Sequence, residues 1–182
     1  MNFKNIHTLH PWHGIPNQWD QEKILGVVEI PRGERCKFEI DKSSGLLKLD
    51  RVLSSSFEYP VNYGFIPQTL EDDGDPLDVL IFSKFPLPSL CLVSLRVIGL
   101  LHMKDRDRLD HKILTVADTD ITQSHIQKME DISVQALSEL KHFFEQYTIL
   151  ENKKVEVKEF GNLNEAKSII DQCILRYNQW QE

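Results

Sequence analysis

The stretch CKFEIDKSSGLLKLDRVL, residues 36–53, predicts the element from which the rest of the fold can be worked out. Phe38 and Ile40 alternate with charged residues, as in a β-strand that buries one face. The residues SSG at 43–45 favour a turn, and a second strand-like run follows them. We therefore predict a β-hairpin over residues 36–53.

Further strand-like runs lie on both sides of this hairpin, between residue 24 and about residue 117. They are ILGVVEI (24–30), LDVLIF (77–82), CLVSLRVIGLL (91–101) and KILTVA (112–117). Short turns join them and no helical pattern intervenes, which favours an antiparallel sheet or barrel. We expect a mainly β fold of the α+β class, whose core is an antiparallel, five-stranded, OB-like β-barrel.

The C-terminal third has the helical spacing of three and four residues. One helix is predicted over residues 133–147, with apolar positions at Val134, Leu137, Leu140, Phe143, Phe144 and Tyr147. A second is predicted after the N-cap Asn164, with apolar positions at Ala166, Ile169, Ile170, Cys173, Ile174 and Tyr177. We expect both helices to pack on the β core of one domain, residues 1–182, in which residues 1–22 form an irregular lead-in.

The composition limits the classes of partner. The chain has 21 Lys and Arg against 28 Asp and Glu, a net charge of −7, and no basic block, so nucleic-acid binding is not expected. The longest apolar stretch, residues 90–101, is too short to cross a bilayer. Three widely spaced cysteines without a CxxC pair, and an N-terminus without an apolar signal region, lead us to expect a cytoplasmic protein without membrane association.

The lead-in carries His7, His10 and His13 at every third position. No carboxylate or thiol cluster accompanies them, so metal ligation is the weaker interpretation. The stronger one is a surface segment that docks on the core through Trp12 and Trp19.

The sequence EDDGDPLDVLIF, residues 71–82, concentrates acidic residues at a turn. Gly and Pro in DGDP bend the chain, so that Asp73, Asp75 and Asp78 can gather around one point. Asp78 lies within an apolar run, and a buried ionised carboxylate is costly unless it is paired or metal-bound. Oxygen ligands without Cys or His point to magnesium, manganese or calcium. Glu71 and Asp72 are expected to be solvated surface residues.

A second acidic patch follows in HMKDRDRLDHK, residues 102–112. Asp105, Asp107 and Asp110 alternate there with lysines and arginines. Taken alone, this is most simply a solvated charged loop. Beside the first patch, it would supply carboxylates and cations suited to a complex of metal and phosphate.

Other polar residues fit a site of this kind. Glu29 interrupts an apolar strand, and the hairpin carries Lys37, Glu39 and Arg51. The run YPVNYGFIP, which contains two tyrosines, comes just before the acidic loop. Tyrosine, lysine and arginine donate hydrogen bonds to phosphate oxygens, although each tyrosine could equally be an ordinary core residue.

These motifs together resemble the magnesium-dependent inorganic pyrophosphatases of family I. DGDPLDV (73–79) matches the aspartate signature of that family. The motifs VVEIPRG, KFEIDKSSGLLKLDR, YPVNYGFIP, VIGLLHMKDRDRLDHK and HFFEQY follow the family's order and approximate spacing. The resemblance covers roughly residues 24–160.

The resemblance implies a set of metal ligands. Asp73, Asp78 and Asp110 would hold the tighter metal, with Asp78 bridging to a second ion. Asp105 and Asp110 would bind metal that arrives with the substrate, and Glu29 would complete that shell. The implied cofactor is Mg²⁺, several ions per site, with Mn²⁺ or Zn²⁺ as substitutes.

The resemblance also implies the groups that handle the substrate. Asp75 would be the general base beside a metal-bridging water, which attacks pyrophosphate directly to release two orthophosphates. The substrate-binding residues would be Lys37, Arg51, Tyr63, Lys112 and Tyr147. The residues lining and orienting the site would be Glu39 and Tyr59.

One position departs from the family pattern, in which Lys commonly follows the tyrosine after the FFE motif. Thr148 stands there, and Lys153 or Lys154 could substitute for the missing cation. Two other functions stay open: a magnesium-dependent phosphatase acting on organic phosphates, and a weakened pyrophosphatase-like scaffold. The resemblance further implies a homo-oligomer, with a hexamer favoured by the chain length over a dimer.

Overall fold

The structure is a computed structural model that describes residues 10–105, 108–151 and 155–181. Its strands are β1 (Lys23–Ile30), β2 (Cys36–Ile40), β3 (Leu47–Val52), β4 (Asn62–Phe65), β5 (Asp78–Phe82), β6 (Leu92–Asp105), β7 (Arg108–Leu109), β8 (Lys112–Ala117) and β9 (Val155–Gly161). Its helices are η2 (Ile121–Gln123), η3 (Met129–Asp131), α1 (Val134–Gln146), η4 (Ile149–Glu151) and α2 (Leu163–Gln181). No helix within the described ranges is long and apolar enough to span a membrane.

The larger sheet has the order β1-β4-β5-β8-β6-β7, with β9 also paired to β6. A further pairing of β1 with β6 closes a cycle of five strands, β1-β4-β5-β8-β6. The prediction of a purely antiparallel sheet is wrong, because β5 and β8 pair in parallel while the other pairs are antiparallel. The sheet is therefore mixed, in an α+β fold. The alternation of apolar and polar residues in a strand does not show whether its partner runs parallel or antiparallel. For β5 and β8, the relative direction depends on the whole connection from residue 83 to residue 111.

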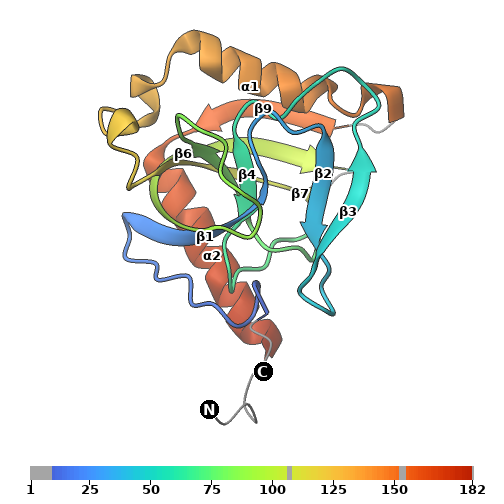
Figure 1. Ribbon diagram of the computed structural model, residues 1–182. Helices are drawn as coiled ribbons and strands as arrows, with labels where there is room; N and C mark the ends of the chain where they lie inside the picture. The colour runs from blue at the N-terminus through green and yellow to red at the C-terminus, as the bar shows by residue number, and fades with distance from the viewer. Residues whose placement is uncertain (1–9, 106–107, 152–154, 182) are drawn as a thin grey trace, which may run out of the picture.

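The predicted hairpin is confirmed, because β2 and β3 pair antiparallel as a separate two-stranded sheet. It stands beside the larger sheet in Figure 1. Glu29 of β1 ties it to that sheet, since its side chain accepts a hydrogen bond of 2.8 Å from the backbone N–H of Ile40. The hairpin thus forms one wall beside the ends of the main strands.

Close packing explains β4, a strand that the sequence patterns did not identify. All four of its residues are buried between β1 and β5. A Cβ at Gly64 would lie 2.0 Å from the carbonyl oxygen of Val27, so only glycine allows the backbones to approach this closely. The alternating pattern of β9 was also missed, although it pairs antiparallel with β6.

The two predicted helices are confirmed and cover the sheet from different sides (Figure 1). Helix α1 buries Leu140, Phe143 and Phe144, but its first residue, Val134, is 81% exposed, contrary to the predicted apolar face. Ser133 caps α1 by accepting a hydrogen bond from the Ala136 N–H.

Helix α2 packs along β6 and starts two residues earlier than expected. Its buried residues are Ala166, Ile170, Cys173 and Tyr177. The N-cap is Asn162 and not Asn164, because the Asn162 Oδ1 accepts hydrogen bonds from the N–H groups of Asn164 and Glu165. Glu165 in turn accepts from the Asn162 N–H, which completes a capping box.

The described part of the lead-in docks as predicted. Trp12 is buried and donates from Nε1 to the Thr69 carbonyl at 2.9 Å. Trp19 donates from Nε1 to the Asp171 carboxylate at 2.7 Å. His10 stacks on His13, with ring centroids 4.5 Å apart. His7 lies outside the described residues.

Candidate active site

The candidate site is a cavity of about 520 Å³ at the meeting point of the hairpin, the acidic loops and the end of α1. Every residue to which the family resemblance gave a metal-binding, catalytic, substrate-binding or lining role lies in the wall of this cavity. These residues are Glu29, Lys37, Glu39, Arg51, Tyr59, Tyr63, Asp73, Asp75, Asp78, Asp105, Asp110, Lys112 and Tyr147. The structure therefore brings together the whole predicted set, although it comes from seven separate segments of the chain.

The parallel pairing of β5 and β8 creates this convergence. Parallel strands begin at the same edge of a sheet, so the loops that precede them meet there. Asp78 begins β5 and lies opposite Lys112, which begins β8. The acidic loop before β5 and the one before β8 consequently face each other across the site.

A buried lysine lies between these two loops. Lys112 Nζ makes ion pairs with Asp78 and Asp110, and its side chain is only 3% exposed. The Tyr63 hydroxyl donates a further hydrogen bond to Asp78. Burial alone would lower the pKa of Lys112, but the attraction of Asp110 and Asp78 outweighs it and raises that pKa above the ordinary value. The lysine thus stays charged in the interior.

Burial disfavours the ionised form of two of the cavity carboxylates, those of Glu29 and Asp78. Burial, together with repulsion from Asp78, raises the pKa of Glu29 to about 8 despite the hydrogen bond from Ile40. Burial also raises the pKa of Asp78, with Asp110 adding to the effect and Lys112 opposing it. Raised carboxylate pKa values are expected where several negative groups lie close together, and a bound cation would stabilise their ionised forms.

The donor set fits a hard divalent cation. The carboxylates offer oxygen ligands only, and Asp105 Oδ1, in the wall of this cavity, is buried without a hydrogen-bond partner among the residues that the structure describes. Within the described ranges, no three His, Cys, Asp or Glu side chains are close enough together to hold one ion as they stand. Lys112 already pairs with two of the central carboxylates, so these would have to exchange the lysine for a metal.

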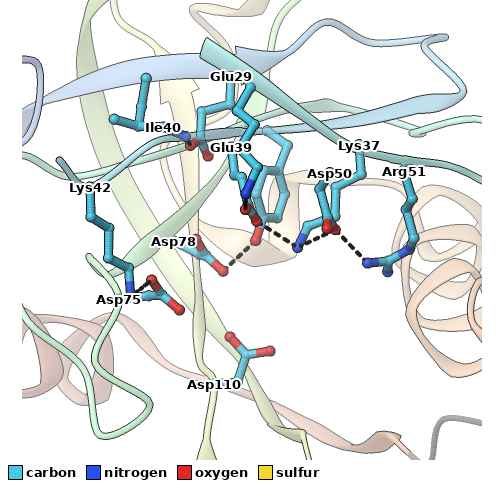
Figure 2. Close-up of polar contacts among 12 residues, drawn as sticks. Glu29, Lys37, Glu39, Ile40, Lys42, Asp50, Arg51, Asp75, Asp78 and Asp110 are labelled. Carbon is cyan, nitrogen blue, oxygen red and sulfur yellow. Dashed lines mark hydrogen bonds and ion pairs between the residues drawn. The ribbon is translucent and has the colours of Figure 1, made fainter. Parts of the chain in front are cut away.

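The hairpin contributes the cations on the opposite wall, as Figure 2 shows. Lys37 Nζ lies 3.4 Å from Asp50 Oδ2, and Arg51 Nη1 lies 2.6 Å from the same oxygen. Arg51 Nε is also 3.1 Å from a carboxylate oxygen of Glu151, and its guanidinium lies 5.8 Å from the centre of the Tyr147 ring. Asp50 and Glu151 were not among the predicted site residues, because no sequence pattern shows which carboxylates lie beside Lys37 and Arg51.

Lys42 is a further cavity residue that sequence reasoning missed. It lies in the turn of the hairpin, and its Nζ is 2.5 Å from an Asp75 carboxylate oxygen and 3.0 Å from the Gly74 carbonyl (Figure 2). The Asp75 N–H donates to Asp73 Oδ1 at 2.9 Å, which shapes the turn. The contact joins the hairpin to the acidic loop, but both charged side chains are about half exposed.

The expectation that Glu71 is a solvated surface residue is wrong. Its exposure is 4%, and its carboxylate accepts a 2.9 Å hydrogen bond from the His111 N–H. Burial raises its pKa to about 8, although this hydrogen bond acts in the opposite direction. Asp72 behaves as predicted: it is partly exposed and pairs with Arg176 at 2.8 Å.

Thr148 lines the cavity beside Tyr147, although its exposure is only 2%. It therefore occupies a place from which a longer cationic side chain could reach the site. Lys153 and Lys154, the suggested substitutes, lie outside the described residues, as does Asp107 of the second acidic patch.

Comparison with known proteins identifies the family. The family model "Inorganic pyrophosphatase" matches residues 26–178. A soluble inorganic pyrophosphatase of Oryza sativa subsp. indica is 45% identical over 171 residues, which cover 93% of this chain and 79% of the relative. An inorganic pyrophosphatase of Campylobacter jejuni is 42% identical over 166 residues, covering 90% and 94%.

The fold leads to the same assignment. The crystal structure of an inorganic pyrophosphatase from Thermus thermophilus matches with a TM-score of 0.88 and 39% identity, covering 93% of this chain and 99% of that one. The residues matched by the family model, 26–178, include every residue of the cavity to which a role was assigned. The chain therefore belongs to the soluble, family I inorganic pyrophosphatases, metal-dependent enzymes that hydrolyse pyrophosphate.

Proposed function

We propose that the carboxylates of the cavity hold the divalent metal and that this metal is Mg²⁺, with Mn²⁺ or Zn²⁺ as substitutes. The proposed ligands are Glu29, Asp73, Asp78, Asp105 and Asp110. Bound ions of this kind lower the pKa of water and neutralise phosphate oxygens. The raised pKa of Glu29 and the unpartnered Asp105 oxygen support this assignment.

The cationic and phenolic groups bind the substrate. Lys37, Arg51 and Lys112 present ammonium and guanidinium groups to phosphate oxygens, joined by the hydroxyls of Tyr63 and Tyr147. These donors come from different walls of the cavity, so they can bind the two phosphates of pyrophosphate at once and hold the bridging bond between them. Glu39 and Tyr59 line the site and limit how the substrate is oriented.

Asp75 accepts the proton of the attacking water. It lines the same cavity but is half exposed, so water reaches it readily. No side chain in this scheme forms a covalent bond to phosphate: the water oxygen attacks one phosphorus, and the second phosphate leaves with the bridging oxygen. The single observation that carries the proposal is that the five proposed carboxylate ligands and the three proposed substrate-binding cations line one cavity.

The test is phosphate release from pyrophosphate with and without Mg²⁺, for the wild type, Asp75→Asn and the control Asp72→Asn. Asp72 lies in the same loop and does not line the cavity. We expect Mg²⁺-dependent release by the wild type and the control, and a large loss in Asp75→Asn with Mg²⁺ binding retained. Full activity of Asp75→Asn would contradict its role as the base.

Four wider expectations belong to the same proposal. We infer one domain over residues 1–182, a cytoplasmic location, and a core that is an OB-like barrel, which the closed cycle of strand pairings supports. We also propose a homo-oligomer, with a hexamer favoured over a dimer. Light scattering of the purified protein separates these masses, and a monomer would exclude both.

A further inference from the structure

Glu71 is a buried carboxylate outside the set of groups assigned to metal or substrate. It does not line the cavity, and its exposure is only 4%. Its Oε1 accepts a hydrogen bond of 2.9 Å from the backbone N–H of His111, the residue between Asp110 and Lys112. The side chain therefore holds the main chain of the second acidic segment at the point where it presents a carboxylate and a cation to the site.

The main chain of Glu71 also closes the first acidic loop. Its N–H donates to the Asp75 carbonyl at 2.8 Å, and its own carbonyl accepts from the Gly74 N–H at 3.1 Å. Gly74 has a φ of +89°, which suits glycine at this tight turn. Asp73 is held inside the turn that these two bonds close. One residue is therefore bonded to both acidic segments, to one by its backbone and to the other by its side chain.

Helix α2 anchors the residues on either side of Glu71. The Leu70 N–H donates to the Cys173 carbonyl at 3.0 Å, and Arg176 donates to the Leu70 carbonyl at 3.0 Å. Arg176 also pairs with Asp72 at 2.8 Å, but both of these side chains are more than a third exposed, so this ion pair adds little to the anchoring. Glu71 is thus fixed to a helix packed on the main sheet, and it has little freedom to follow a displaced loop.

We propose that Glu71 is a positioning residue that sets the distance between the two acidic segments and thereby the affinity of the site for metal. This inference rests on the metal-ligand role proposed above for Asp73, Asp78 and Asp110. It adds a residue that acts through the His111 backbone and touches neither metal nor substrate. Outer groups that orient metal ligands commonly change affinity by about 10- to 100-fold when removed.

Three substitutions separate this role from simple support of the fold. Glu71→Gln keeps an acceptor oxygen of the same reach, Glu71→Leu keeps a similar volume without an acceptor, and Glu71→Asp keeps the carboxylate but withdraws it by one methylene. Asp72→Asn is the matched control in the neighbouring position, since its side chain faces α2. Circular dichroism and gel filtration establish that each variant is folded before metal is added.

The main readout is Mg²⁺ binding to the metal-free protein, measured by titration calorimetry without substrate. We expect the dissociation constant of Glu71→Leu to rise at least about tenfold, that of Glu71→Asp to rise less, and those of Glu71→Gln and Asp72→Asn to stay within about twofold. A similar split should appear in the Mg²⁺ concentration needed for half-maximal pyrophosphate hydrolysis. Should Glu71→Leu fail to fold, the contrast between Glu71→Asp and Glu71→Gln decides the question.

The outcomes that would overturn the inference are distinct. Wild-type Mg²⁺ affinity in folded Glu71→Leu or Glu71→Asp, with only a lower melting temperature, would mean that Glu71 supports the fold alone. Equal weakening in Glu71→Gln would mean that the negative charge, and not the hydrogen bond, matters. Absence of Mg²⁺ binding by the wild type would instead refute the proposed metal site itself.

Discussion

The two walls of the cavity are built in different ways. The carboxylate wall consists of the loops before β5 and β8, two strands buried within the main sheet. The wall that we propose to bind phosphate is the β2–β3 hairpin, whose strands are mostly half-buried or exposed. Its charged residues pair with one another, and those pairs are partly open to solvent. Core packing therefore holds the carboxylate wall, whereas the charged side chains of the hairpin wall are held by ion pairs that solvent screens, so they can adjust to a ligand.

The largest effect is expected on the carboxylate wall, in Asp78→Asn. This change removes a proposed metal ligand. It also removes the ion pair between Lys112 and Asp78, while the ion pair between Lys112 and Asp110 remains. We expect kcat/KM to fall at least about a thousandfold, roughly 4 kcal/mol of transition-state stabilisation. Steady-state phosphate release measures the loss, and Asp72→Asn is the control. A loss below tenfold would mean that the buried wall does not carry the chemistry.

Metal binding to the same wall should depend on pH. The pKa of Glu29 is raised to about 8, so at pH 7 the metal-free carboxyl group keeps its proton, whereas a ligand must be ionised. Binding therefore releases a proton, and Mg²⁺ affinity should rise by up to about tenfold per pH unit between pH 6 and 8. Calorimetry in two buffers of different ionisation enthalpy counts the protons.

Glu29→Gln provides the control for that titration. It keeps an acceptor for the Ile40 N–H but has no proton to release, so the proton count at pH 7 should decrease. An unchanged count would show that the released protons come from other groups, and a flat affinity between pH 6 and 8 would refute the linkage.

The hairpin wall should respond differently, in substrate affinity and not in metal affinity. In Arg51→Lys, a single ammonium group replaces the planar guanidinium group, which can bind two phosphate oxygens at once. We expect the KM for pyrophosphate to rise about tenfold while the Mg²⁺ dissociation constant stays unchanged. Arg35→Lys is the control, because Arg35 donates to the Ser55 carbonyl and does not line the cavity. Weakened metal binding in Arg51→Lys would remove the distinction between the walls.

The smallest effect is expected from Thr148→Lys, which adds the cation common in the family. Thr148 lines the cavity, so the new ammonium group could reach a bound phosphate. We expect the inhibition constant of inorganic phosphate to fall about fivefold, roughly 1 kcal/mol. Ile149→Lys places the same charge on the exposed neighbour and should leave phosphate inhibition unchanged. Equal phosphate affinity in Thr148→Lys and the wild type would exclude this role.

The part of the site that was predictable consists of residues in recognisable motifs. Asp73, Asp75 and Asp78 follow from a turn that precedes an apolar run, and both hairpin strands follow from alternation. Lys42 and Asp50 lie within the hairpin motif and Glu151 lies outside the motifs, but no local pattern indicates what these three side chains contact. Their roles depend on partners that are distant in sequence or face them across the hairpin.

Glu71 shows the same limit for a single residue. Three aspartates follow Glu71 within four residues, so the local composition indicates a solvent-exposed side chain. Its actual environment is set by His111, in the loop before β8, and by the hydrogen bonds that anchor Leu70 to α2. The burial of this carboxylate beside a charged turn results from tertiary packing, and a local sequence pattern carries no information about tertiary packing.

The sequence by itself determined the strand and helix periods, the acidic loops, the missing lysine at Thr148 and, through the order of its motifs, the family. Only the tertiary structure decided that β5 and β8 run parallel, that Lys112 lies between Asp78 and Asp110, and that Glu71 is buried. The physical reason is that period and turn chemistry are properties of neighbouring residues. Strand partners, burial and the charges that surround a carboxylate are set by segments far apart in the chain.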